Sequence, residues 1–384
     1  MSEALKKHIP PAETGERRKV DPDRAYFDHL TPDQKALWIA DHRFDMHKPD
    51  DFDLQGFPGG EDTKSAVSSL LDRVEGRLDQ KRIRQLEQGL NVSVDIWDKA
   101  GLFTPEREKA GYAKPNFDTH YLPYITQERL DLTGQGEGLD KGYNVPSFAP
   151  MDVPVYSEDP DALSYFKLLE QALTEAFHGT MGGKQPDTLL IGPEKRSIRA
   201  NQANLKKILW KWEKYLSSTE FVFEPETLDP ENHNGLSEQG LLASLTGVEK
   251  QTGGVLRMER PSLIMPKDAG KEEMSGRDWD ALAKNPGNPL PKQISYQNLK
   301  EMLSYAIQCL KTQGWIPDFY DWNSVASSKV CLAPRTFIPK VEGVSAGAVP
   351  CSCWAVVSWR FRVGRRDADF QVSDAGVRGG LRIN

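Results

Sequence analysis

Apolar residues recur at helical spacing in several separate stretches of this 384-residue chain. In the stretch 63–90, a seam of two heptads is followed by a step of five residues to Ile83. Such a step turns the apolar face by roughly 120°, so we expect the helix to break near Asp79 or its halves to pack on different neighbours. Further helices are predicted between Asp159 and Gly179, over 197–216, and from a Ser295 cap to Gly314.

The last 55 residues change to the period of two that is typical of strands. Apolar residues alternate from Cys353 to Val363, while Arg360 and Arg362 fall on the opposite face. This pattern predicts one half-buried strand with a basic outer face. Other short strands are predicted at 189–191, 221–223, 330–332, 336–338 and 370–372.

Two parts of the chain follow neither period. Residues 1–30 are polar and read as an arm, and seven prolines are interleaved with aromatic residues between 101 and 160. An extended segment of that kind either docks its rings in grooves on another molecule or wraps its own domain as a long loop. The sequence leaves these two alternatives open.

Together the patterns predict an α+β fold. It has a mainly helical middle region, a C-terminal antiparallel β element and long extended Pro/aromatic-rich segments. We predict five parts: a polar N-terminal arm (1–60), a helical pair (61–100), an extended Pro/Tyr-rich segment (101–158), a mainly helical domain (159–320) and a C-terminal β-rich region (321–384).

Composition and charge exclude several classes of protein. The longest apolar runs have five residues, far below the roughly 20 of a membrane-spanning helix, so we expect no membrane insertion. The net charge of −7 gives no general attraction to nucleic acid, which leaves only local basic patches. The first twenty residues hold no apolar signal segment, and the four cysteines form no disulfide framework. We therefore expect an intracellular (cytoplasmic) or virion location.

Three patterns resemble sites of chemistry, and each has a simpler interpretation. Gly343-Val-Ser-Ala-Gly347 matches a nucleophile elbow, but a strand follows it and no histidine lies beyond His233, so a Gly-rich turn is the better interpretation. His42 and His47 are five residues apart, which is not the spacing of a helical zinc pair. Zinc ligation by the C-terminal cysteines is weighed against buried free thiols, which we favour. We expect no catalytic residues, metal or cofactor.

The basic side of the predicted helix 197–216 is the strongest candidate for binding. Trp210 lies among lysines there, opposite the apolar stripe, and an exposed indole among ammonium groups can stack a base while the cations meet phosphates. The alternative is that Trp210 packs on another element and the lysines form an ordinary solvated face. The candidate nucleic-acid-binding residues are Arg196, Arg199, Lys206, Lys207, Trp210, Lys211, Lys214, Arg360 and Arg362.

The arm, the helical pair and the extended segment favour a protein that holds other chains. We predict a structural, non-enzymatic subunit of a large assembly, with a virion coat or nucleocapsid-like protein as the first guess. Its predicted partners are other protein chains, either copies of itself or subunits of one assembly, together with nucleic acid. The alternative is a soluble intracellular enzyme whose site is not recognisable in the sequence.

Overall fold

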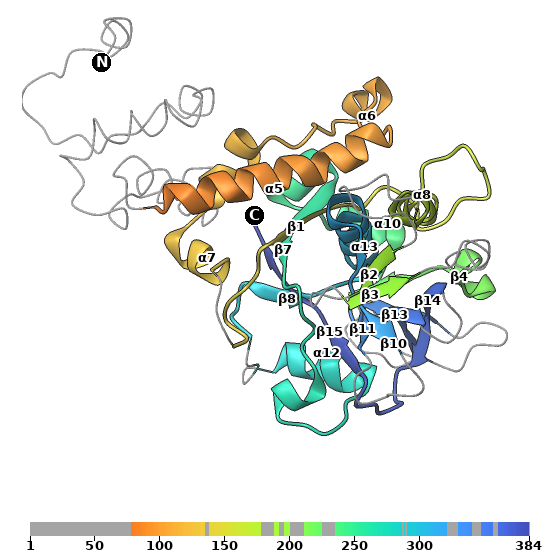
Figure 1. The fold of residues 1–384 in the computed structure, drawn as a ribbon. Helices are drawn as coiled ribbons and strands as arrows, with labels where there is room; N and C mark the ends of the chain where they lie inside the picture. Colours follow the sequence, from red (N-terminus) through yellow and green to blue (C-terminus); the bar gives the residue numbers. More distant parts are fainter. Residues whose placement is uncertain are drawn as a thin grey trace, which may run out of the picture.

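A computed structural model places helices and antiparallel or mixed sheets around one large hydrophobic core, which is an α+β fold (Figure 1). The core includes residues from Leu78 to Ile383. The structure describes residues 78–134, 138–177, 188–191, 196–199, 211–224, 235–285, 288, 290–320, 329–339, 347–355 and 360–383. The predicted arm 1–60 and most of the heptad seam therefore lie outside the described residues.

A four-stranded antiparallel sheet lies at the centre of the fold. Its strands, in spatial order, are β1 (Val145–Pro150), β7 (Gly254–Glu259), β16 (Gly379–Arg382) and β8 (Ile294–Tyr296). Helices α5 (Gln80–Lys99) and α13 (Leu299–Gln313) pack on β1, and α8 (Tyr165–Phe177) packs on α13. The last strand of the chain is thus inserted between two earlier ones.

A six-stranded mixed sheet holds most of the C-terminal region. It consists of β15 (Ala375–Val377), β11 (Val330–Leu332), β13 (Ala348–Ala355), β14 (Arg360–Asp367) and β4 (Lys211–Trp212), with β10 (Phe319–Tyr320) also paired to β13. Two further sheets have three strands each. The first consists of β12 (Thr336–Phe337), β5 (Val222–Phe223) and β6 (Leu236–Ser237). The second consists of β3 (Arg196–Arg199), β2 (Thr188–Ile191) and β9 (Trp315–Ile316).

Short helices make up many of the connections between these elements. They are α6 (Pro105–Lys109), the π-helix η3 (Phe117–Tyr121), η4 (Leu122–Tyr124), α7 (Gln127–Leu132), η5 (Lys214–Ser217), α10 (Glu238–Ala243), α11 (Gly247–Thr252), η6 (Pro266–Ala269) and α12 (Gly276–Lys284). No helix in the described part of the chain is both long enough and apolar enough to cross a bilayer.

Side-chain caps set where the main helices begin. The Asp79 carboxylate accepts hydrogen bonds from the amides of Lys81 and Arg82, so α5 begins directly after Asp79, where the sequence predicts a break. The helix predicted from Ser295 instead begins after Asn298, whose side chain caps the Glu301 amide. Ser295 lies in β8, so its predicted capping role is wrong. Gly314 ends α13 in the left-handed region, as predicted.

The Pro/aromatic-rich segment 101–158 wraps its own domain in the residues that the structure describes. Phe117, Tyr121, Tyr143 and Phe148 are all buried in the core of the same chain. Of the two alternatives that the sequence left open, the structure shows a long loop that wraps its own domain, with these rings packed inside it and not on another molecule. The prediction of a long extended segment is not supported, because short helices and β1 occupy much of it.

The prediction of a helix over 197–216 is wrong in the described residues. Arg196–Arg199 form β3, in which Ile198 lies opposite Leu189 of β2, and Lys211–Trp212 form β4. Strand pairing with β2 and with β14 therefore overrides the local helical periodicity of the sequence. Residues 200–210 lie outside the described part of the chain.

The single strand predicted from Cys353 to Val363 is a hairpin of β13 and β14. Trp354 lies opposite Phe361 and Ser352 opposite Val363, and all four side chains are buried. Cys353 lies opposite Arg362 on the other face. Phe361 and Val363 therefore share a face with Ser352 and Trp354, so the prediction that Cys353 lies on the same face as Phe361 and Val363 is wrong. Residues 370–372 form only a bridge from Val372 to Met274, and β15 begins at Ala375.

The fold predicts that Trp97 is a major source of stability. Its indole nitrogen donates to the Phe148 carbonyl at 2.7 Å, and its ring meets Tyr165 edge-on at 4.9 Å. Trp97→Ala should lower the free energy of unfolding by about 3–5 kcal/mol in urea denaturation. Val92→Ala on the same helix, where the side chain is 46% exposed, should change it by less than about 0.5 kcal/mol. Equal effects of the two substitutions would contradict this packing.

Candidate functional site

The pairing of β4 with β14 brings two distant basic stretches together. The strands are parallel, with Lys211 opposite Arg362 and Trp212 opposite Val363. Lys214 follows in η5 with its side chain exposed. The pairing therefore brings Arg362 beside Lys211 in two strands, where the sequence predicts a helix around residue 211, and a binding role for these residues stays a prediction.

The other predicted binding residues are divided between several places. Arg360 begins β14, next to the patch. Arg196 and Arg199 belong to β3, which is in a separate sheet. Lys206, Lys207 and Trp210 lie outside the described residues. The structure thus gathers Lys211, Lys214, Arg360 and Arg362 at one sheet edge, and it does not place Arg196 and Arg199 in that sheet.

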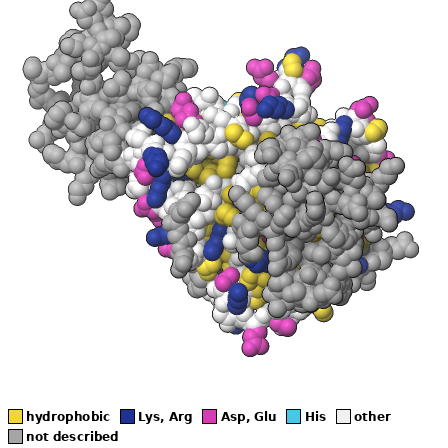
Figure 2. Space-filling view, viewed as in Figure 1, with side chains coloured by type: hydrophobic (Ala, Val, Ile, Leu, Met, Phe, Trp, Pro, Cys, Tyr) yellow, Lys and Arg dark blue, Asp and Glu magenta, His cyan; other side chains and the backbone are white. Residues whose placement is uncertain are grey.

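A cleft of about 340 Å³ opens beside this edge, and we call it the hairpin cleft. It contains three arginines against two carboxylates, and Phe370 at its wall is 60% exposed. On the face shown in Figure 2, by contrast, Lys and Arg side chains stand among Asp and Glu side chains. The hairpin cleft is lined by Glu213, Val330, Cys351, Cys353, Arg362, Gly364, Arg365, Arg366, Asp367 and Phe370.

Specific partners hold the arginines of the hairpin cleft in place. Arg362 donates to the Glu213 carboxylate at 3.1 Å, and Arg366 donates to Asp374 at 3.0 Å. The Arg365 guanidinium lies 5.1 Å from the centre of the Tyr215 ring. Guanidinium groups fixed in this way lose less conformational entropy when they bind an anion than mobile lysines do.

The two cysteines of the hairpin cleft are unsuited to nucleophilic chemistry. Cys351 and Cys353 share one face of β13, and all four cysteines of the chain are free thiols. Burial raises the pKa of Cys351 to about 11 and also raises the pKa of Cys353, so both are neutral at physiological pH. Within the described residues no three His, Cys, Asp or Glu side chains are grouped to hold a metal.

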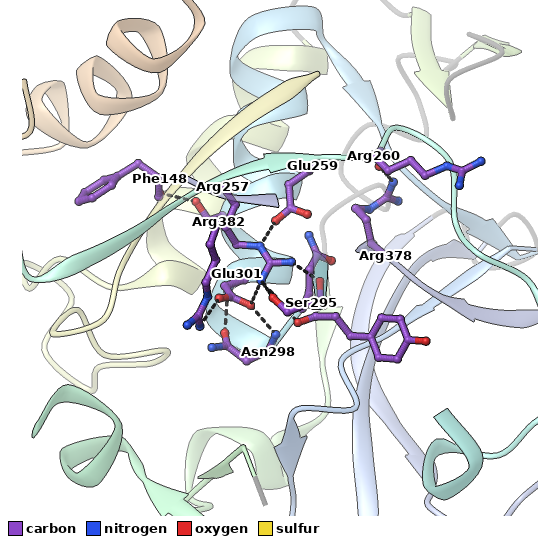
Figure 3. A network of polar contacts seen from close by, with 12 residues as sticks. Phe148, Arg257, Glu259, Arg260, Ser295, Asn298, Glu301, Arg378 and Arg382 are labelled. Carbon is purple, nitrogen blue, oxygen red and sulfur yellow. Dashed lines mark hydrogen bonds and ion pairs between the residues drawn. The ribbon is translucent and has the colours of Figure 1, made fainter. Parts of the chain in front are cut away.

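A second polar site, which the sequence analysis missed, lies on the central sheet. Arg257 and Glu259 project from one face of β7, and Arg382 of β16 lies opposite Arg257 (Figure 3). The Arg257 guanidinium donates to Glu259 at 2.8 Å and to Glu301 of α13 at 3.0 Å. All three of these side chains are fully buried. We call Arg257, Glu259, Glu301, Arg335 and Arg382 the buried network.

Glu301 is the carboxylate on which the arginines converge. Arg257, Arg335 and Arg382 approach it at 3.0, 3.6 and 3.4 Å. It also accepts the Asn298 amide at 2.9 Å, which completes the capping box of α13. One carboxylate therefore both starts a helix and neutralises part of a buried cationic cluster.

Burial shifts the protonation of neighbouring groups. It raises the pKa of Glu259, against the opposing effect of Arg257, and it lowers the pKa of Lys300 on α13. The Lys300 ammonium donates to the Met151 carbonyl at 2.7 Å and lies 3.5 Å from Glu238. Buried titratable groups of this kind occur both in structural networks and at functional sites.

A cavity of about 270 Å³ adjoins the buried network. Arg335 belongs to both, and Ser295, which lines the cavity, accepts a hydrogen bond from Arg257 at 2.9 Å. The cavity, here called the α12 cavity, is lined by Glu224, Asp280, Ala283, Lys284, Asn288, Leu290, Ile294, Ser295, Tyr296 and Arg335.

No family model, curated protein or solved structure matches this chain. The function therefore has to be argued from the hairpin cleft, the buried network and the α12 cavity.

The buried network predicts a strict requirement for glycine at position 380. A Cβ built there would overlap the Arg257 guanidinium and the Glu259 carboxylate. Gly380→Ala should therefore break this ion pair and lower the free energy of unfolding by about 3–5 kcal/mol. Gly240→Ala in α10, where an added Cβ meets only atoms at 3.5 Å, should be neutral or stabilising by up to about 1 kcal/mol. Urea denaturation of both variants checks this, and a Gly380→Ala chain of parental stability would refute the requirement.

Proposed function

We propose that this chain is a subunit of a large assembly and binds nucleic acid in the hairpin cleft. A virion coat or nucleocapsid-like protein remains the first guess within that class. The observation that carries the proposal is the parallel pairing of β4 with β14. It places the chain at Lys211 and Lys214 beside the chain at Arg360 and Arg362, and Arg362 lines a cleft together with two further arginines.

The residues of the hairpin cleft match the two chemical parts of a nucleotide. Guanidinium groups bind phosphate oxygens through paired, charge-assisted hydrogen bonds. The exposed Phe370 ring offers a flat apolar surface on which a base can stack. Stacking needs a base that is free of its neighbours, so we favour a single-stranded ligand. Because the whole chain carries a charge of −7, attraction to the ligand has to come from local basic groups such as those of this cleft.

The assembly part of the proposal rests on the sequence. The polar arm 1–60 is rich in charged residues and poor in apolar ones, which is typical of segments that partners order. The segment 101–158 no longer supports an assembly role, because four of its aromatic residues are buried in the core of the same chain and three more pack against that core.

A soluble enzyme is the second candidate, and one observation favours it. The α12 cavity adjoins a buried cluster of arginines and glutamates, a combination that is common at active sites. Size-exclusion chromatography with light scattering and absorbance at two wavelengths separates the candidates. The assembly proposal predicts a large species or co-eluting nucleic acid. A compact monomer free of nucleic acid would favour the enzyme.

The hairpin cleft predicts which substitutions weaken binding. Replacing Arg362, Arg365 and Arg366 together with glutamine should raise the Kd for a single-stranded RNA at least tenfold at low salt. It should also reduce the slope of log K against log salt by about 2, because roughly 0.7 counterions are released per phosphate contact. Fluorescence anisotropy over a salt series measures both quantities.

A matched variant controls for net charge. Lys99, Lys109 and Lys141 are exposed and lie outside the hairpin cleft, so their joint replacement with glutamine should leave the affinity within about twofold. Phe370→Ala should weaken binding by about 1–3 kcal/mol without changing the salt slope, since stacking releases no counterion. Absence of RNA binding by the parent chain, or equal losses in the two triple variants, would overturn the nucleic-acid proposal.

A further inference from the structure

The α12 cavity has the size of a small metabolite. Its volume of about 270 Å³ lies just below the roughly 300–1,000 Å³ of drug-sized ligand sites, which suits a ligand as small as one amino acid or a dipeptide. Its walls come from the C-terminal half of α12, from β8, and from Glu224 and Arg335. Leu290, Ile294 and Ala283 supply the apolar part of the lining.

Charges of both signs line the cavity in equal number. Arg335 contacts Glu224, and Lys284 donates to Asp280 at 2.8 Å. Arg335 also donates to the Tyr296 carbonyl at 3.2 Å and to the Ser295 hydroxyl at 3.4 Å. An anion alone would lie against two carboxylates, and a cation alone would lie against two basic groups. A ligand that carries both charges avoids both conflicts.

The backbone holds one of these carboxylates in an unusual conformation. Among the described residues Glu224 alone, glycine excepted, has a positive φ, of 50°. A side chain in this region costs of order 1 kcal/mol or more, and such strain persists where the surroundings impose it. Here the Glu224 amide donates to the Arg335 carbonyl, and its carboxylate meets both Arg335 and Arg382. The strained backbone at Glu224 therefore holds its carboxylate at the wall of the cavity, beside the Arg335 guanidinium.

We infer that the α12 cavity binds a small zwitterion, namely an α-amino acid or dipeptide with an apolar side chain. Its carboxylate meets Arg335 and Lys284, its ammonium meets Glu224 and Asp280, and its side chain lies against Leu290 and Ile294. The inference is independent of nucleic-acid binding, because none of the cavity residues lines the hairpin cleft.

Isothermal titration calorimetry on the full chain tests the inference with four probes. L-leucine and the dipeptide Leu-Leu keep both charges, L-leucinamide lacks the carboxylate, and N-acetyl-L-leucine lacks the ammonium. We expect at least one zwitterion to bind with a Kd of about 1 mM or tighter. The two singly charged derivatives should bind at least tenfold more weakly. No binding of either zwitterion, or equal binding of all four probes, would overturn the inference.

Two substitutions assign the charges to their partners. Glu224→Gln should lower the affinity for the zwitterion at least fivefold. It should leave the affinity for N-acetyl-L-leucine unchanged, since that probe has no ammonium. Lys284→Gln should lower the affinity for the zwitterion and leave the affinity for L-leucinamide unchanged, since that probe has no carboxylate. Lys284 is 46% exposed, so this variant should fold even if Glu224→Gln does not. The exposed Glu272→Gln is the matched control, and it should bind like the parent. Parental affinity in both cavity variants would place the ligand elsewhere and refute the inference.

Discussion

The burial of Arg257 between Glu259 and Glu301 is the constraint on which the centre of the molecule depends. A guanidinium fully removed from water is tolerated only when carboxylates and hydrogen-bond acceptors surround it. Its partners come from β7, from β8 and from the first turn of α13. The sheet therefore has to bring these elements together, and Gly380 of β16 leaves the space that the ion pair occupies.

A second buried pair connects this centre to the six-stranded sheet. Arg378, directly before β16, donates to both Asp318 oxygens at 2.8 and 2.9 Å. The Asp318 carbonyl in turn accepts the Trp354 amide of β13 at 2.7 Å. The hairpin cleft and the α12 cavity thus lie on two sheets that one buried ion pair joins. The frame thus carries two separate polar sites, for which we propose a single-stranded nucleic acid and a small zwitterion as ligands.

The sequence allowed the ends of single helices and strands to be predicted, but not the way in which separate elements pair and pack. The start of α5 at Asp79, the end of α13 at Gly314 and the strand at 330–332 each follow from a cap or a local period. The period of two could not show that the chain reverses after Ala355, because apolar residues continue at alternate positions through the turn while the buried face changes from even positions on β13 to odd positions on β14. The buried network was also hidden, since its members lie up to 125 positions apart, from Arg257 to Arg382. For the hairpin cleft, the sequence identified Arg362 but gave no sign that Phe370 would be exposed.

A double-mutant cycle between Arg257 and Glu301 tests most directly whether the buried network governs the fold. Urea denaturation would give the free energy of unfolding for Arg257→Met, for Glu301→Gln and for the double variant. If the pair is the central constraint, each single variant removes part of the charge compensation in the buried network and loses about 3–5 kcal/mol, while the double variant loses clearly less than the sum of the two. Losses that simply add would show that the two side chains act independently and would contradict the account.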